Sequence, residues 1–232
     1  MRQRPLIPID RERMSGKKRD KSSRIQRRSK ELSIASAKNT QRVESKRQQI
    51  VDGSCRIFFR KGYHPTTIRE IANACRMSMG QLYHYISSKD DVLYLVHKHM
   101  QNIWYKYLEN SDYGEAKEPV QKLSRALHRT LKFMSENRKL IQFIYSESKY
   151  LDRQHLQAVL DMDKKNVIGF WYKMLTEVNA KKTIKADLNF LASLITYLLV
   201  FLPLRGWTLR GMSLRQEEAS IVDFILKGLG VI

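Results

Sequence analysis

The polar side chains best placed for chemistry lie in one short segment, residues 78–86, which reads SMGQLYHYI. At helical spacing its two aliphatic residues share one face, and the opposite face carries groups that hydrogen-bond to nucleobases or phosphates. Gln81 has the donor and acceptor needed to recognise adenine, and Tyr83 and His84 can contact a thymine methyl group or a phosphate. Gly80 has no side chain, so the backbone can approach a ligand closely. The segment predicts contact with DNA.

Patterns typical of catalysis or metal binding do not occur in the sequence. There is no Gly-rich phosphate loop, HExxH or paired CxxC. His97 and His99 are two residues apart, so they diverge on a helix and do not form a metal pair. Cys55 and Cys75 lie in apolar helical patterns, which favours small buried side chains over redox chemistry. We therefore expect no metal site, no cofactor and no enzymatic activity.

The elements that must position residues 78–86 begin at three closely spaced helix N-caps. Thr67 with Glu70, and Ser78 with Gln81, have the spacing of capping boxes. Ser88 starts a third helix, with two carboxylates in a first turn where the helix dipole favours them. The first two helices are too short to be stable alone and must pack on something. A short helix, a tight turn and a second short helix are typical of a helix-turn-helix DNA-binding motif.

Apolar residues at helical spacing predict an all-α fold with no strand. Gly62 is expected to end the first helix in the C′ position. Nine helices are expected, over residues 44–61, 67–74, 79–85, 89–108, 119–137, 138–149, 152–178, 187–204 and 213–227.

The charge of the 232-residue chain is strongly positive, with a formal net value of +20. This excess indicates a polyanionic partner, either nucleic acid or an anionic membrane surface. Residues 1–47 carry 16 of the Lys and Arg residues against 5 Asp and Glu. We expect residues 1–42 to be a disordered basic arm that either adds phosphate contacts to DNA or is a solvated tail.

The sequence favours a cytoplasmic location because no apolar signal-peptide core is present at the N-terminus. Leu188 to Leu204 has no charged residue. It is short for a bilayer and contains polar residues and a proline, so a buried helix is favoured over a membrane span.

Residues 50–93 resemble the N-terminal domain of TetR-family transcriptional regulators. The residues that carry the resemblance are Ile50, Ile57-Phe58, Lys61-Gly62-Tyr63, residues 66–72, residues 78–85, Ser88-Lys89 and Val92-Leu93. Two positions depart from the family pattern. Arg76 stands in the turn where Gly is common, which predicts a strained or shifted left-handed position. Gly53 replaces a usual Ala inside the first helix, at a helix-propensity cost of about 1 kcal/mol.

The resemblance implies a helix-turn-helix domain over residues 43–93 and a larger helical effector-binding and dimerisation domain over residues 94–232. The residues expected to contact a double-stranded DNA operator are Thr66, Thr67, Arg69, Met79, Gly80, Gln81, Tyr83, His84 and Lys89. For Arg69, an ion pair with Glu44 or Asp52 is the alternative. Tyr85 lies nearer the core face, so core packing and DNA contact are both open for it.

A second set of residues lies in the C-terminal half: 144–147, the long helix after Asp152, 206–207, 212–214 and 225–229. These residues resemble the ligand domain of TetR regulators that control fatty-acid, steroid and related acyl-CoA degradation. This resemblance implies a bacterial ligand-responsive repressor, with a small apolar or acyl-CoA-like effector that releases a homodimer from a palindromic operator. The residues expected to line the effector pocket, unless they are ordinary core, are Trp104, Phe133, Phe143, Tyr145, Trp171 and Tyr197.

The dimer contact is expected from the last two helices, around Leu188 to Leu204 and Ile221 to Leu229, which are too apolar to face water. Burial within the monomer is the alternative. A second hypothesis keeps the DNA-binding domain but gives the helical domain a protein partner instead of a small molecule. A third, a basic protein of membrane surfaces, depends on the N-terminal arm alone.

Overall fold

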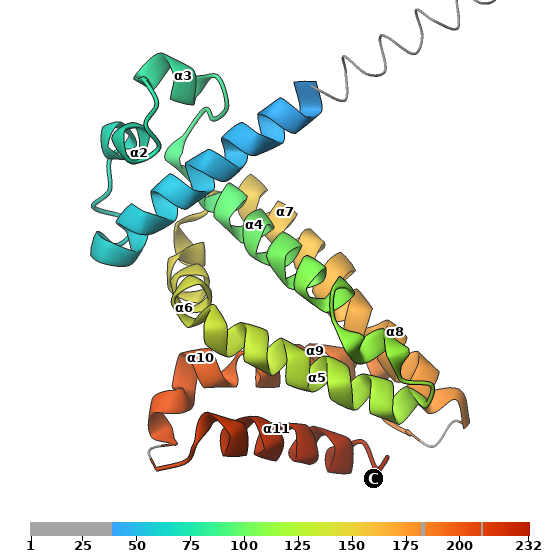
Figure 1. Cartoon of the computed structure of the whole chain (residues 1–232). Coiled ribbons are helices and arrows are strands. Elements are labelled where there is room, and N and C mark those ends of the chain that lie inside the picture. Colours follow the sequence, from blue (N-terminus) through green and yellow to red (C-terminus); the bar gives the residue numbers. More distant parts are fainter. Residues whose placement is uncertain (1–38, 182–183, 210) are drawn as a thin grey trace, which may run out of the picture. The chain divides into compact units, whose positions relative to one another are not determined.

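The computed structural model describes residues 39–181, 184–209 and 211–232 (Figure 1). The chain divides into two compact units, residues 1–46 and 47–232. In the first unit the described residues, 39–46, are helical, and the predicted basic arm up to residue 38 lies outside the described residues. The described residues form helices and no strand, which confirms the all-α fold.

The second unit begins with the helix-turn-helix elements. Helical residues 47–61 are followed by Gly62, whose φ of +85° confirms its C′ position. The three predicted helix starts are also confirmed, because Thr67, Ser78 and Ser88 each form a complete capping box. The helices that they open are α2 (Ile68–Ala74), α3 (Met79–Tyr83) and α4 (Lys89–Glu109).

The remaining helices pack as a larger assembly in which α4 lies along α7, and α5 lies against α8 and α11. In chain order they are α5 (Pro119–Glu136), α6 (Arg138–Glu147), α7 (Arg153–Asp163), α8 (Gly169–Val178), α9 (Leu188–Leu199), α10 (Phe201–Arg205) and α11 (Leu214–Gly228). Short 3₁₀ turns, among them Asp112–Glu115, connect several of them.

Two of the predicted helices are each divided in the described part of the chain. A π-helical turn, Lys164–Ile168, separates α7 from α8. The uncharged helix breaks between α9 and α10, which are bent by 43°. Pro203 explains this break, since it has no N–H to donate to the carbonyl of Leu199 and its ring clashes there. No single helix in the described ranges is long and apolar enough to cross a membrane, although the bent pair passes that test by length and composition.

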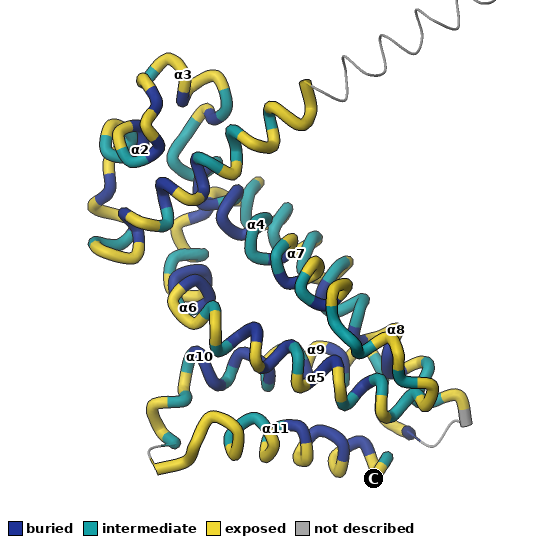
Figure 2. The backbone as a smooth tube through the Cα atoms, viewed as in Figure 1, coloured by how far each residue is buried: buried dark blue, intermediate teal, exposed yellow. Residues whose placement is uncertain are grey.

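The core of the second unit consists of two clusters of buried residues. Figure 2 marks the buried positions along the backbone in dark blue. One cluster joins the helix-turn-helix elements to the start of α4 and to α6. The other fills the space between α5, α8, α9, α11 and the end of α4. Because α4 contributes to both clusters, the domain boundary predicted at residue 93 falls inside a continuous helix.

Candidate nucleic-acid interface and ligand clefts

The exposed side of α3 carries the polar residues that the sequence analysis selected. Gly80, Gln81, Tyr83 and His84, which we call the recognition face, are all exposed. Leu82 anchors the helix because it is completely buried. Two neighbouring side chains lie at the edge of the recognition face: Met79 and Tyr85 are half-buried and pack on the core.

Gln81 is both a recognition-face residue and part of a helix cap. Its side-chain oxygen accepts a hydrogen bond of 3.0 Å from the backbone N–H of Ser78, while its own N–H donates to Ser78 Oγ. The side-chain amide hydrogens point to no acceptor in this arrangement. Because the cap uses only one of the two lone pairs of this oxygen, the second lone pair and the amide hydrogens remain for contact with adenine.

The N-terminus of α2 already holds a carboxylate. Glu70 accepts a hydrogen bond of 2.8 Å from the backbone N–H of Thr67 and forms a 2.7 Å ion pair with Lys61. The Lys61 ammonium, and then Thr67, hold the pKa of Glu70 at about 2. Thr67 itself is exposed. Its hydroxyl donates to the Glu70 carboxylate at 2.9 Å and accepts from the Glu70 backbone N–H. An incoming phosphate at Thr67 would therefore meet an ionised carboxylate and a hydroxyl that is already engaged.

Thr66 and Lys89 hold the loop before α2 in place. Thr66 is 2% exposed, and its hydroxyl donates to the Gly62 carbonyl at 2.7 Å. Lys89 Nζ lies 3.2, 3.0 and 3.1 Å from the carbonyl oxygens of Tyr63, His64 and Thr66, and 4.4 Å from the Tyr63 ring centroid. Its three donors are thus engaged within the protein. In this conformation both side chains are directed to backbone carbonyls of the loop.

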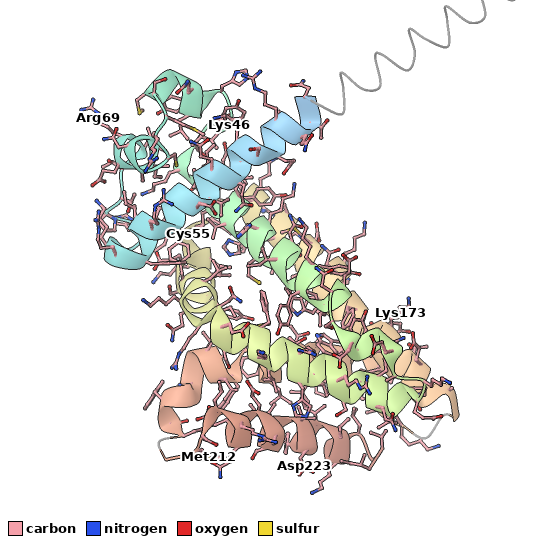
Figure 3. All side chains as sticks on the ribbon, in the orientation of Figure 1. Lys46, Cys55, Arg69, Lys173, Met212 and Asp223 are labelled. Atoms are coloured by element: carbon pink, nitrogen blue, oxygen red, sulfur yellow. The ribbon has the colours of Figure 1, made fainter. Side chains whose placement is uncertain are left out.

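Arg69 projects outward from α2 (Figure 3) and is exposed. It forms no ion pair or hydrogen bond with another residue of the described second unit, and Asp52 instead accepts from Gln48. Of the predicted phosphate contacts, Arg69 is the one with an uncommitted cation.

The structure shows the surroundings of Arg76 and Gly53, the two positions that depart from the family pattern. Arg76 adopts φ +54°, so the left-handed position predicted for the turn is present and an Arg occupies it. Gly53 is required by packing, because a Cβ there would lie 2.5 Å from Cys75 Sγ and 2.9 Å from Cys75 Cα. Sequence reasoning treated Gly53 only as a loss of helix propensity, since the approach of Cys75 has no local signature.

The residues predicted to line an effector pocket do not come together. Trp104 and Trp171 are buried, and their rings pack on Phe170 at 5.4 and 5.0 Å. Phe143 belongs to the other core cluster and stacks on Phe58 at 5.2 Å. Tyr145 and Tyr197 are exposed. Phe133 lines a cleft.

Two clefts open beside α4. The acidic cleft, of about 920 Å³, includes Phe133, two cations and three carboxylates. The lysine cleft, of about 370 Å³, lies between α4, α5 and α8 and has three lysines against one carboxylate. The residues that line the lysine cleft are Tyr105, Tyr113, Lys122, Lys165, Asn166, Gly169, Phe170, Lys173, Met174 and Glu177.

Sequence comparison finds relatives of the helix-turn-helix region. Residues 50–94 match the family model described as "Bacterial regulatory proteins, tetR family". This stretch of the chain, which holds the helix-turn-helix, thus resembles the tetR family. HbdR, an HTH-type transcriptional regulator of Aromatoleum sp. strain CIB, is 33% identical over 85 residues, which span 37% of this chain and 37% of HbdR. The match thus covers little more than a third of that curated relative.

The same TetR fold extends over most of the second unit. FadR from Bacillus subtilis, solved with stearoyl-CoA, superposes with a TM-score of 0.63 at 19% identity, over 80% of this chain and 98% of FadR. AibR, solved with isovaleryl coenzyme A and operator DNA, gives a TM-score of 0.62 at 19% identity, over 77% of this chain and 97% of AibR. At these identities the likeness shows the fold.

Proposed function

We propose that this TetR-family protein is a transcriptional repressor of the bacterial cytoplasm that binds a palindromic DNA operator as a homodimer. The observation that carries the proposal is the recognition face, a row of exposed polar residues on a short helix that is fixed at its N-terminus and buried on its other side. Arg69 on α2 supplies a free cation beside it, and the net charge of +20 favours a polyanion.

Gel-shift titration against the DNA upstream of its own gene tests this proposal. Tyr83→Ala and His84→Ala should each weaken specific binding by about 1–3 kcal/mol, because base contacts carry that much discrimination. Arg69→Ala should weaken binding to all sequences and reduce the salt slope by about one. Tyr145→Ala, which removes an exposed tyrosine from α6, is the matched control. An intact dimer that shifts no DNA at low salt would refute DNA regulation.

We further propose that an anionic amphiphile of the acyl-CoA type is the effector and that its charged part binds in the lysine cleft. Lys165 and Lys173 are exposed and form no ion pair among the described residues, whereas Lys122 is paired with Glu177 at 2.8 Å. Three aromatic rings beside them offer an apolar wall. The acidic cleft suits an anion less well, because Asp112 already binds Arg129 and two further carboxylates lie nearby.

Calorimetric titration with acyl-CoAs of increasing chain length tests the effector proposal. The Lys165→Glu/Lys173→Glu protein should lose about tenfold or more in affinity, since two attractive charges become repulsive. Lys139→Glu on α6 makes the same kind of charge change away from both clefts. If no acyl-CoA binds the wild-type protein, the hypothesis of a protein partner is favoured.

A further inference from the structure

His155 is held between two carboxylates that belong to different helices. It lies in the first turn of α7, with 21% of its side chain exposed. Its Nδ1 lies 2.7 Å from Asp152 Oδ2, and its Nε2 lies 2.9 Å from Asp91 Oδ1. Asp152 is the N-cap of α7, and Asp91 is the third residue of α4. One imidazole ring therefore connects the beginnings of two long helices.

Both contacts can be hydrogen bonds only if the imidazole is doubly protonated. A neutral ring has one N–H and one lone pair, so it can donate to only one of the two carboxylates. The second contact would then place a lone pair against an anionic oxygen at less than 3 Å. Loss of the proton therefore breaks one of the two connections and makes it repulsive.

The groups that face His155 favour the charged ring. From α4 these are the Asp91 carboxylate and the Tyr94 ring, whose centroid lies 5.4 Å away. From its own helix, the backbone N–H and the ring of His155 both donate to Asp152, and they lower the pKa of that carboxyl. The ammonium of Lys89, in the first turn of α4, is directed to loop carbonyls.

Asp91 extends this connection to the segment that follows α3. Its second carboxylate oxygen accepts from the backbone N–H groups of Ser87 and Ser88, the latter at 3.1 Å. The same carboxylate thus joins the end of the helix-turn-helix to α7, through the ring of His155.

We propose that His155 is a proton-dependent clamp, closed as the imidazolium and loosened when the proton is lost, that joins α7 to the first turn of α4 and to the Ser87–Ser88 backbone. Acid pH favours the closed arrangement, because the proton completes both hydrogen bonds, and rising pH weakens it. The clamp therefore makes the attachment of the DNA-binding elements to the helical domain sensitive to pH.

Nitrogen NMR of the full-length, ¹⁵N-histidine-labelled protein tests the clamp directly. On acidification both ring nitrogens of His155 should carry a proton at once, and Asp91→Asn should make the doubly protonated ring less favourable. The exposed His84 serves as the internal reference and should be unchanged by Asp91→Asn. A protonation equilibrium of His155 that Asp91→Asn leaves unchanged would overturn the proposal.

A second measurement tests the consequence for DNA and rests on the proposed function. Operator affinity of the wild-type protein should change about fivefold between about pH 6 and about pH 8.5, after correction for salt. His155→Gln should remove this change, whereas His128→Gln on α5 should retain it. A pH dependence that persists in His155→Gln would overturn the coupling to DNA. If no variant binds DNA, the proposed function fails while the NMR experiment still decides the clamp.

Discussion

Two glycines in the helix-turn-helix differ in what surrounds the missing side chain. Gly53 has no room for a Cβ, because Cys75 backbone atoms would lie 2.9 Å away. Around Gly80, apart from its two chain neighbours and the backbone of its own helix, no atom lies within 4 Å of the position that a Cβ would take. The same substitution at the two positions therefore separates folding from function.

Gly53→Ala should destabilise the protein by about 1–3 kcal/mol, the cost of overpacking a core, even though Ala is the better helix former. Gly80→Ala should leave stability unchanged or slightly raised and should weaken operator binding, since only the DNA backbone or bases would meet the new methyl group. Urea unfolding and gel shifts of both variants check this. Equal stability of Gly53→Ala and the wild type would contradict the packing argument.

Arg76 occupies a left-handed position at the end of α2. That conformation costs a side-chain-bearing residue about 1–2 kcal/mol. Arg76→Gly should therefore raise the free energy of unfolding by about 1 kcal/mol. The gain is smaller than the full cost of the strain, because glycine increases the entropy of the unfolded chain. Arg76→Ala keeps the strained Cβ and should show no gain in thermal unfolding. If both variants are equally stabilised, removal of the positive charge is the cause.

At the scale of elements, the helix starts were predictable and the helix interruptions were not. Thr67, Ser78, Ser88 and Ser213 act within their own first turns, so their roles follow from local sequence. The π turn at Lys164–Ile168 has no local cause of that kind. Within it, the side chain of Asn166 donates a hydrogen bond to Gln101 of α4, which is distant in the sequence. Pro203 was a local cue for the break before α10, but the continuous apolar pattern around it favoured a single helix.

The candidate site followed the same rule. The exposed positions of α3 were predictable from helical periodicity around Leu82. The contact of Lys89 with the loop before α2 was not predictable, because its three carbonyl partners lie more than twenty residues earlier in the chain. The aromatic residues of the helical domain carry no sequence cue that distinguishes a cleft wall from a core.

Helix α6 provides the clearest case. Phe143 was expected either to line an effector pocket or to be ordinary core, and it stacks on Phe58 with ring planes 9° apart. Phe143→Ala should destabilise the protein by about 3–5 kcal/mol, as expected for a buried Phe. Its neighbour on the same helix, Tyr145, is 45% exposed, and Tyr145→Ala should change stability by no more than about 0.5 kcal/mol. Thermal unfolding of the two variants checks this. A stable Phe143→Ala protein with altered ligand binding would support the original pocket prediction.

At the scale of the molecule, apolar residues remain uncovered on the last helices. Phe190, Leu194 and Tyr197 recur at helical spacing along α9 and are 63%, 40% and 63% exposed, and Phe224 on α11 is 64% exposed. Because α9 and α11 pack on each other, these side chains belong to one pair of helices. Large exposed apolar groups on adjacent helices favour association with a second copy through a four-helix contact.

Phe190→Glu combined with Phe224→Glu should therefore give a folded monomer. Both side chains are exposed within one chain, so the charges cost little in the monomer but are buried unpaired in a dimer. Light scattering should show the mass of the variant at 27.4 kDa and that of the wild type at twice this value. Leu160→Glu, at an exposed position of α7, is the control and should leave the dimer intact.

The same variant also tests whether the proposed dimer is needed for operator binding. One helix-turn-helix reads only a few base pairs, and a palindromic operator presents two half-sites about one DNA turn apart. The monomeric variant retains the whole recognition face and Arg69, so it should keep weak, salt-sensitive binding to any DNA. It should lose the preference for the operator by about a hundredfold or more, because the second half-site contributes only when two recognition helices are joined. Full operator affinity in a proven monomer would show that α9 and α11 face another partner.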